Sequence, residues 1–158
     1  MGRLQRELRQ NKPFQSSAQE AVLGLLRTAD LMRRQITALV DPHGLTMQQF
    51  NVLRILRGAD AEGRDGMPTL DIADRMIEQT PGVTRLLDRL ESKELVRRQR
   101  CPKDRRQHLC WITPKGLAIL AKIDEGSARA NEELMKGLRA KDCETLIRLM
   151  EAVRAPHQ

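Results

Sequence analysis

The sequence is poor in aromatic residues and contains no long apolar segment. Its 158 residues include two phenylalanines, one tryptophan and no tyrosine, so it lacks the aromatic platforms on which single-stranded nucleic acids stack. No apolar run approaches the roughly 20 residues of a membrane-spanning helix, and the charged amino terminus is unlike a secretory signal. We therefore expect a cytoplasmic protein without membrane association.

Cysteine, histidine and catalytic motifs are also scarce. The three cysteines, Cys101, Cys110 and Cys143, are an odd number without a Cys-x-x-Cys pair, so neither a disulfide framework nor a zinc site is indicated. The three histidines are dispersed, and P-loop, GxGxxG, GxSxG and HExxH patterns are absent. We predict that the chain is not an enzyme and uses no metal or cofactor.

What the sequence does have is a local excess of positive charge. The segment from Thr80 to Lys115 contains ten basic and four acidic residues, and so carries six of the chain's seven net positive charges. A concentrated basic surface is expected of a protein that meets phosphates. The alternative interpretation of such a run is a charged hairpin that is simply solvated. The order of a helix followed by a hairpin in this segment favours the phosphate-binding interpretation over that alternative.

The same segment reads as a helix followed by a hairpin. Its first half has apolar residues at helical spacing, while polar and basic residues fill the remaining faces; the apolar positions are Val83, Leu86, Leu87 and Leu90. Thr80 can cap this helix and Pro81 suits its first position. Extended residues then begin at Leu95, a polar turn surrounds Pro102, and residues 109–113 form a second strand. This is the order of elements in a winged helix.

The flanking segments predict further helices. Residues 1–14 form a basic arm that we expect to be disordered, and a long helix occupies residues 15–41. A second helix opens with a capping box at Thr46 and Gln49, a loop covers 58–66, and a short strand at Met67 and Pro68 precedes a third helix over about 69–77.

Beyond the hairpin, two carboxy-terminal helices fill residues 114–158. The first begins at Thr113 and Pro114, and the second is expected to be capped by Asp142. The terminal helices carry larger apolar faces than a small winged helix can cover, so we expect them to pack together and against a second copy. The fold class is therefore mainly α: a winged helix-turn-helix domain over 42–113, flanked by dimerisation helices.

Four sequence signatures in this order resemble the MarR-type winged-helix transcription regulators. They are the run from Val83 to Glu91, residues 95–98, Asp104 to Arg106, and residues 112–116. The similarity covers nearly all of the chain. At Glu94 the sequence departs from the glycine that usually ends the recognition helix of this family, so we expect that helix end to be shaped differently.

The resemblance implies a homodimer that binds a palindromic operator in double-stranded DNA, most simply as a repressor. In a helix-turn-helix, the start of the second helix enters the major groove, and a short cationic hairpin suits the minor groove. The predicted DNA-binding residues are Thr80, Pro81, Gly82, Thr84, Arg85, Arg89, Lys103, Asp104, Arg105 and Arg106. Arg85 can read a guanine or contact phosphate alone, and the sequence leaves both open. The resemblance further implies that Asp88 and Asp104 pair with hairpin arginines and hold the hairpin in place.

Regulation can be read in two ways. The family resemblance implies a pocket for a small aromatic or phenolic effector, with Met32, His43, Met47 and Phe50 as candidate lining residues, although each also suits an ordinary core or loop position. The rival is thiol oxidation at Cys101, whose basic neighbours favour the thiolate. A winged helix used only for protein contact, or for structured RNA, is a further alternative.

Overall fold

The chain folds as helices around one small sheet, as predicted. The computed structural model describes residues 2–79, 81–102, 104 and 106–157. The helices are α1 (Arg3–Glu7), α2 (Ser17–Val40), η1 (Asp41–His43), α3 (Met47–Ala61), α4 (Thr69–Asp74), α5 (Val83–Ser92), α6 (Pro114–Met135), α7 (Ala140–Arg154) and η2 (Ala155–His157), and the strands are β1 (Met67–Pro68), β2 (Val96–Arg100) and β3 (His108–Ile112). The strands form an antiparallel sheet in the order β1-β3-β2.

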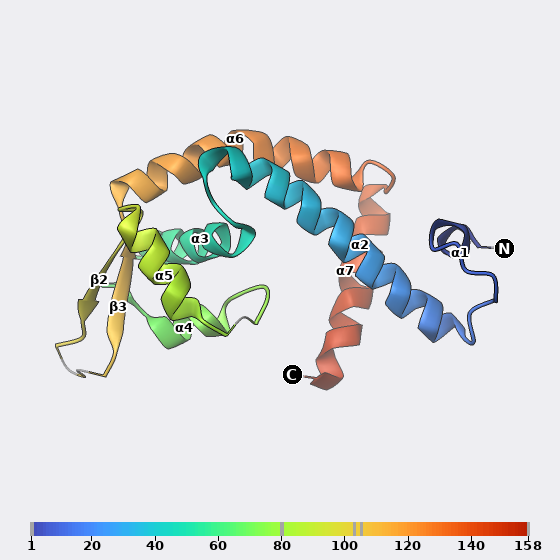
Figure 1. Ribbon diagram of the computed structural model, residues 1–158, viewed down its shortest axis with the longest axis horizontal. Helices are drawn as coiled ribbons and strands as arrows, with labels where there is room; N and C mark the ends of the chain where they lie inside the picture. The colour runs from blue at the N-terminus through green and yellow to red at the C-terminus, as the bar shows by residue number, and fades with distance from the viewer. Residues whose placement is uncertain (1, 80, 103, 105, 158) are drawn as a thin grey trace.

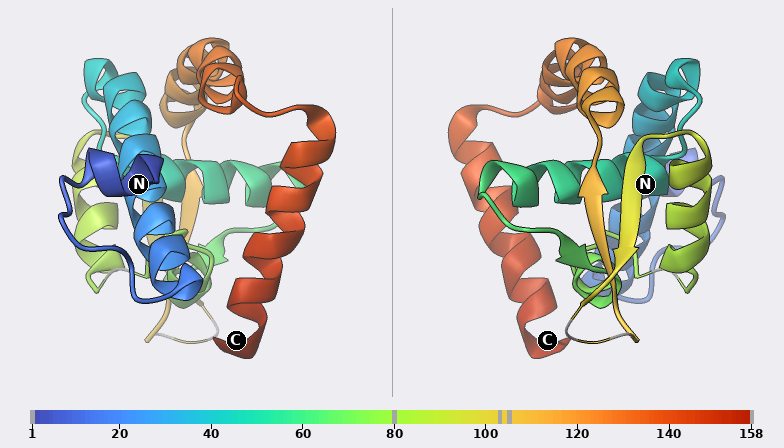
Figure 2. Two further views of the ribbon diagram at one scale, coloured as in Figure 1. Left: turned by 90° about the vertical axis from the view of Figure 1, so that its right-hand side faces the viewer. Right: turned by 90° about the vertical axis from the view of Figure 1, so that its left-hand side faces the viewer.

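The elements are arranged as a compact lobe with long helices extending from it. In Figure 1, α3, α4, α5 and the sheet lie together at the left, α6 runs along the top toward α7, and α2, which contacts α6, slopes toward the lower right. The β2-β3 hairpin projects from the end of the lobe beside α5 (Figures 1 and 2). This is a winged helix-turn-helix with added terminal helices, so the predicted fold class is confirmed.

The core of the lobe is made by apolar residues from every element that surrounds it. Leu53 and Leu56 of α3, Leu87 of α5 and Leu120 of α6 are at most 1% exposed. Burying a leucine side chain stabilises the fold by roughly 1.5–3 kcal/mol. Because α6 and α5 share this core, the position of α5 is fixed relative to the long helices.

Capping explains where the main helices begin. The Thr46 side chain accepts the N–H of Gln49, whose side-chain oxygen accepts the N–H of Thr46, so the predicted capping box is formed. Thr113 caps α6 through the N–H of Gly116 at 3.1 Å. Ser16 caps α2 through the N–H of Gln19.

Several predicted helix ends were wrong. Residues 58–61, expected in a loop, continue α3 to Ala61, because glycine is only weakly unfavourable inside an exposed helix. The helix α4 ends at Asp74, three residues before the predicted Ile77. At α7 the N-cap is Arg139, and Asp142 lies three residues into the helix, where its carboxylate accepts the Arg139 N–H at 3.1 Å.

The amino-terminal arm also differs from the disordered segment that its charge suggested. Residues Arg3–Glu7 form α1, in which Gln5 is 8% exposed and donates to the Gln10 carbonyl at 3.3 Å. A Cβ on Gly24 of α2 would lie 3.6 Å from Leu4, so α1 packs where α2 has no side chain. This local packing is not visible in the charge pattern of the arm.

The terminal helices expose apolar side chains. On α2, Val22 and Leu26 are 56% and 63% exposed, and on α7 Ile147, Leu149 and Val153 are 53–57% exposed. Figure 2 shows α7 standing apart from α2, so these faces do not cover each other. Among the described residues, every helix is too short or too polar to cross a bilayer. Exposed apolar faces such as those on α2 and α7 commonly mark a surface that contacts another protein.

Candidate nucleic-acid interface

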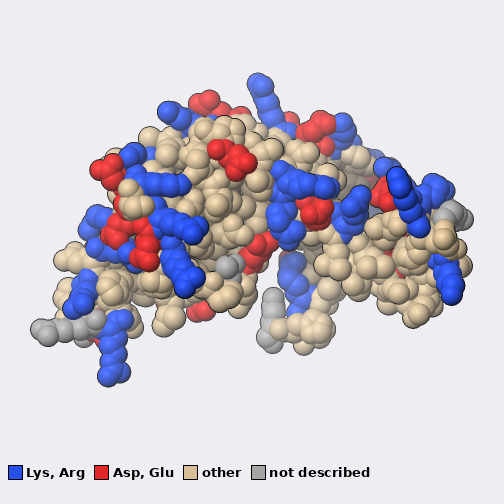
Figure 3. Space-filling view, viewed as in Figure 1, with Lys and Arg blue, Asp and Glu red and all other residues tan. Residues whose placement is uncertain are grey.

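The helix α5 buries one face and presents the other to solvent. Val83, Leu87 and Leu90 are buried in the core. The predicted contact residues on the remaining face are all exposed: Thr84, Arg85 and Arg89. Asp88, predicted to hold the hairpin in place, is exposed on the same face. Lys and Arg side chains gather over α5 and the neighbouring hairpin in Figure 3, with acidic side chains between them. The structure therefore brings the helical part of the predicted site together on one polar surface.

The start of α5 differs from the sequence prediction. We expected Pro81 at the first helical position, but the helix begins at Val83, and Gly82 precedes it with a φ of 105°. A residue with a Cβ would be strained in this left-handed conformation, so glycine lets the chain turn sharply into the helix. Pro81 and Gly82 are exposed at this turn. The predicted Thr80 cap lies outside the described residues.

The end of α5 is also unlike the prediction, because Glu94 adopts the left-handed conformation usually filled by glycine. Its φ is 61°. The Glu94 carbonyl accepts the Thr113 hydroxyl at 2.8 Å, and its carboxylate accepts Lys115 at 2.8 Å. The hydrogen bond from Lys115, together with its charge, holds the pKa of the Glu94 carboxyl below its usual value. These contacts keep a glycine-like helix end in spite of the Cβ.

Replacing Glu94 by glycine is expected to stabilise the protein, raising Tm by about 2–4 °C, because relief of left-handed strain outweighs one exposed ion pair. The gain should widen as pH falls through the lowered pKa of Glu94, since the wild type then loses its contact with Lys115. Thermal unfolding at several pH values measures both effects.

Gly44→Ala is the matched control, because Gly44 has a φ of 68° with open space around it. This substitution should lower Tm. A lower Tm for Glu94→Gly would show that the Lys115 contact dominates.

Arg98 joins the hairpin to α5. Its guanidinium donates to Asp88 at 2.5 Å and to Glu91 at 2.7 and 2.9 Å, and its backbone N–H donates to the other Glu91 oxygen at 3.1 Å. Its side chain is 17% exposed. Burial alone would lower the pKa of Arg98, but the bonds to Glu91 and Asp88 raise it. Charge-assisted bonds of this kind fix geometry strongly, so strand β2 is fastened to the recognition helix.

This arrangement places Asp88 beside a hairpin arginine, the role proposed for it. Asp104 makes a different contact: its carboxylate accepts the backbone N–H of Arg106 at 3.0 Å, and its carbonyl accepts the N–H of Gln107 at 3.0 Å. Asp104 therefore shapes the turn at the hairpin tip. Arg106 is exposed at that tip. The other two predicted tip residues, Lys103 and Arg105, lie outside the described residues.

The base of the hairpin packs against the loop that precedes β1. The Arg97 guanidinium lies 4.0 Å from the centre of the Trp111 ring, a cation–π contact. A Cβ on Gly66 would come within 2.6 Å of the same ring. The loop can approach Trp111 this closely only because Gly66 has no side chain. The guanidinium of Arg97, like that of Arg98, therefore contacts another side chain of the same protein.

The two cysteines near the hairpin differ in environment. Cys110 in β3 is buried and lies 3.8 Å from the Thr69 hydroxyl. Burial raises the pKa of its thiol, which disfavours the reactive thiolate. Cys101 is half-buried at the start of the tip turn. Thiol control through Cys101 stays a prediction. Within the described part of the chain, no three His, Cys, Asp or Glu side chains are grouped to hold a metal.

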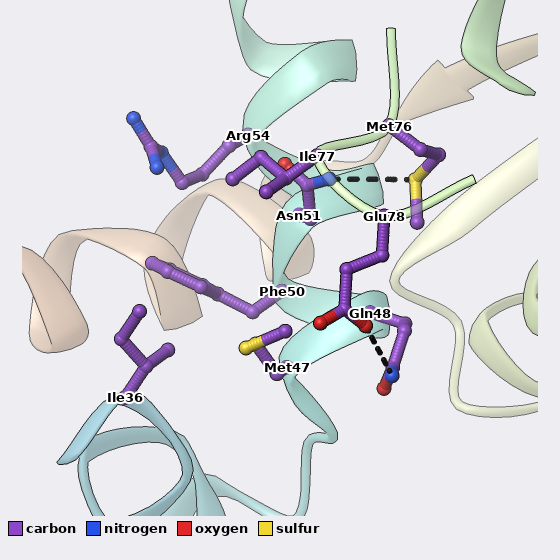
Figure 4. A pocket seen from close by; sticks show the side chains of 9 residues that line it. All are labelled: Ile36, Met47, Gln48, Phe50, Asn51, Arg54, Met76, Ile77 and Glu78. Atoms are coloured by element: carbon purple, nitrogen blue, oxygen red, sulfur yellow. Dashed lines mark hydrogen bonds between the residues drawn. The ribbon is translucent and has the colours of Figure 1, made fainter. Parts of the chain in front are cut away.

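A small cavity lies between the lobe and α2. Its volume is about 70 Å³, and Figure 4 shows its lining from three elements. The lining residues are Ile36 of α2, Met47, Gln48, Phe50, Asn51 and Arg54 of α3, and Met76, Ile77 and Glu78 of the segment after α4. Of the predicted pocket residues, Met47 and Phe50 are brought together here, whereas Met32 and His43 are not among its lining.

Sequence reasoning missed most of this lining, in two different ways. Ile36 is one helical turn from Met32, Asn51 is four residues after Met47, and Arg54 is four residues after Phe50, so the local pattern could have found them. Met76 to Glu78 are distant in sequence and carry no local signal. Arg54 lies 5.7 Å from the centre of the Phe50 ring, and in Figure 4 its guanidinium points away from the other lining residues.

The buried core, the exposed face of α5 and the hairpin fastened to it define a winged helix-turn-helix protein of the DNA-binding class. The model of the MarR family matches residues 45–108. A MarR transcription factor of known crystal structure from Planctomyces limnophilus is 39% identical, with 89% of this chain and 99% of that chain covered and a TM-score of 0.67. The chain belongs to the MarR family of transcriptional regulators.

Two further relatives are informative. The HTH-type transcriptional regulator MhqR of Bacillus subtilis (strain 168) is 29% identical over 114 residues, which are 72% of this chain and 75% of that protein. A cysteine-to-serine mutant of MarR from E. coli, solved in complex with operator DNA, is 28% identical with a TM-score of 0.73, covering 82% of this chain and 89% of that one.

Proposed function

We propose that this protein is a dimeric repressor that binds a palindromic operator in double-stranded DNA. The observation that carries the proposal is the union of two exposed elements by Arg98: the polar face of α5 and the cationic hairpin form one rigid surface. In this arrangement α5 enters the major groove, with Arg85 nearest the bases, and Arg106 at the hairpin tip reaches the adjacent minor groove. The E. coli relative was solved in complex with operator DNA, which supports double-stranded DNA as the partner of this chain.

Dimerisation is supported by the apolar faces of α2 and α7. Side chains such as Leu26 and Leu149 are more than half exposed in the single chain, and burying them against a second copy is favourable. A two-fold axis would place the two recognition helices about 34 Å apart, one turn of DNA, so that each reads one half of a palindrome. Two modest contacts then combine into one specific complex.

The cavity between α2 and α3 supports control by a small ligand. Met47, Phe50 and Met76 give it an apolar lining, and the Gln48 and Asn51 amides offer polar contacts. Such a combination suits a small aromatic ligand. Because the cavity adjoins the segment that leads into α5, occupancy would alter the recognition helix and release the operator.

The test is selection of bound sequences from a random duplex pool, followed by titration of the selected site at several salt concentrations. We expect a palindrome with half-sites about one helical turn apart and a steep fall of affinity with salt. The operator should lower expression of a reporter placed behind it, and small aromatic acids such as benzoate should restore it. Recovery of no preferred duplex, or tight binding only to protein or structured RNA, would contradict the proposal.

A further inference from the structure

One carboxylate ties the segment before α5 to two other helices. Glu78 lies between α4 and α5, and each of its oxygens is held by a different element. The Arg33 Nε of α2 donates to Oε1 at 2.9 Å, and the Gln48 Nε2 of α3 donates to Oε2 at 3.3 Å. Figure 4 shows the second of these contacts and the position of Glu78 at the cavity.

The segment held by Glu78 leads directly into the recognition helix. The described residues between Asp74 and Val83 are in no helix or strand. Met76 is 6% exposed and accepts a weak bond from the Asn51 amide at 3.5 Å, whereas Ile77 is 73% exposed. Apart from the burial of Met76, the contacts of Glu78 with Arg33 and Gln48 are therefore the main described interactions that hold this segment against α2 and α3. Their loss would leave the start of α5 less well placed.

The Arg33–Glu78 pair contributes little to the stability of the fold. The two side chains are 48% and 31% exposed, and exposed ion pairs are weak. The main effect of the pair is therefore to fix the position of the segment that contains Glu78, rather than to stabilise the fold. An exposed pair can also be separated at small cost, which is what a part that moves on ligand binding requires.

The size of the cavity indicates which wall would move. Its 70 Å³ is about half of the roughly 150 Å³ that holds a benzene ring in a protein interior, so an aromatic ligand must widen it. On the α3 side, Phe50 and Asn51 are 7% and 8% exposed and belong to the core. The wall formed by residues 76–78 has no regular backbone structure. Widening would displace that wall and separate Glu78 from Arg33.

We propose that Glu78 is a positioning residue for DNA recognition: it sets the start of α5 by binding Arg33 and Gln48, and a ligand in the cavity acts by breaking this link. The inference rests on the proposed function and specifies how the cavity is connected to the DNA-binding surface. It predicts that loss of the carboxylate mimics the ligand. Because Glu78→Gln makes the protein more positive, simple electrostatics predicts the opposite, tighter binding to DNA.

The experiment compares Glu78→Gln with Asp30→Asn, using the selected operator and an unrelated duplex of equal length. Asp30 pairs with Arg34 at 3.2 Å within α2, so its replacement removes the same charge from an exposed ion pair that does not reach residues 76–78. We expect Glu78→Gln to lose at least about fivefold in operator affinity with unchanged affinity for the unrelated duplex. Asp30→Asn should keep operator affinity. The reversed pair, Arg33→Glu with Glu78→Arg, should restore it.

Three other results would overturn the inference. Equal operator affinity for Glu78→Gln and Asp30→Asn overturns the inference, as does an equal loss on both duplexes. A reversed pair that melts like the wild type without regaining affinity overturns it too. If the wild type itself shows no salt-dependent binding to duplex DNA, both the proposed function and this inference are wrong. If the wild type binds but the variants do not behave as expected, only this inference is wrong.

Discussion

Replacing Arg106 by alanine is expected to lower operator affinity by about 10²-fold or more while the protein stays folded. A hydrogen bond that involves a charged group contributes about 1.5–3 kcal/mol, and a dimer on a palindrome makes the contact twice. The combined loss of about 3–6 kcal/mol corresponds to roughly 10²- to 10⁴-fold in Kd. The side chain is exposed, and the turn is held by the backbone N–H of Arg106, which alanine keeps, so the hairpin should retain its shape.

The measurement is a titration of the selected operator at several salt concentrations, with thermal unfolding as the check on folding. Loss of one cationic contact in each subunit should reduce the salt dependence by about two counterions per dimer. Lys122→Ala removes the same charge from an exposed position on α6 and should change operator affinity only slightly. A folded Arg106→Ala protein with full affinity would show that the hairpin tip does not meet DNA.

The winged helix and most of its elements could be predicted because their signals are local. Helical spacing of Val83, Leu87 and Leu90 defines which face of α5 is buried, and the capping pair of Thr46 and Gln49 marks the start of α3. The errors fall where local signals compete. Proline at 81 suits a first helical position, but the left-handed Gly82 delays the helix by two residues.

The functional surface was less predictable because the sequence gives the charge of a side chain but not its partner. The family resemblance paired Asp88 with a hairpin arginine, but it did not show that this arginine is Arg98 or that Glu91 is its second partner. Glu78 and Arg33 are 45 residues apart in sequence, so no motif connects them. Glu94 is the converse case: the departure from glycine was visible, but its tertiary contacts with Thr113 and Lys115, which preserve the helix end, were not.

The second large effect is expected from a substitution at the junction between the hairpin and α6. Gly116 lies in the first turn of α6, and a Cβ there would overlap the Leu95 carbonyl oxygen and come within 2.8 Å of the Ile112 side chain. The carbonyl cannot rotate away, because it accepts the Thr113 N–H at 3.1 Å where the hairpin meets α6. Glycine therefore allows α6 to sit directly on the base of the hairpin, so that one residue couples the two parts.

We expect Gly116→Ala to destabilise the protein by about 2 kcal/mol, since overpacking costs about 1–3 kcal/mol, at the upper end against backbone, and the better helix propensity of alanine returns a little under 1 kcal/mol. Tm should fall by about 4–8 °C. Gly58→Ala is the matched control: Gly58 lies within α3 with no atom near a Cβ, so the same substitution should raise Tm. Thermal unfolding of both variants gives the comparison. A Gly116→Ala protein as stable as Gly58→Ala would mean that α6 can shift off the hairpin freely, and the rigid surface on which operator binding is proposed would lose its support.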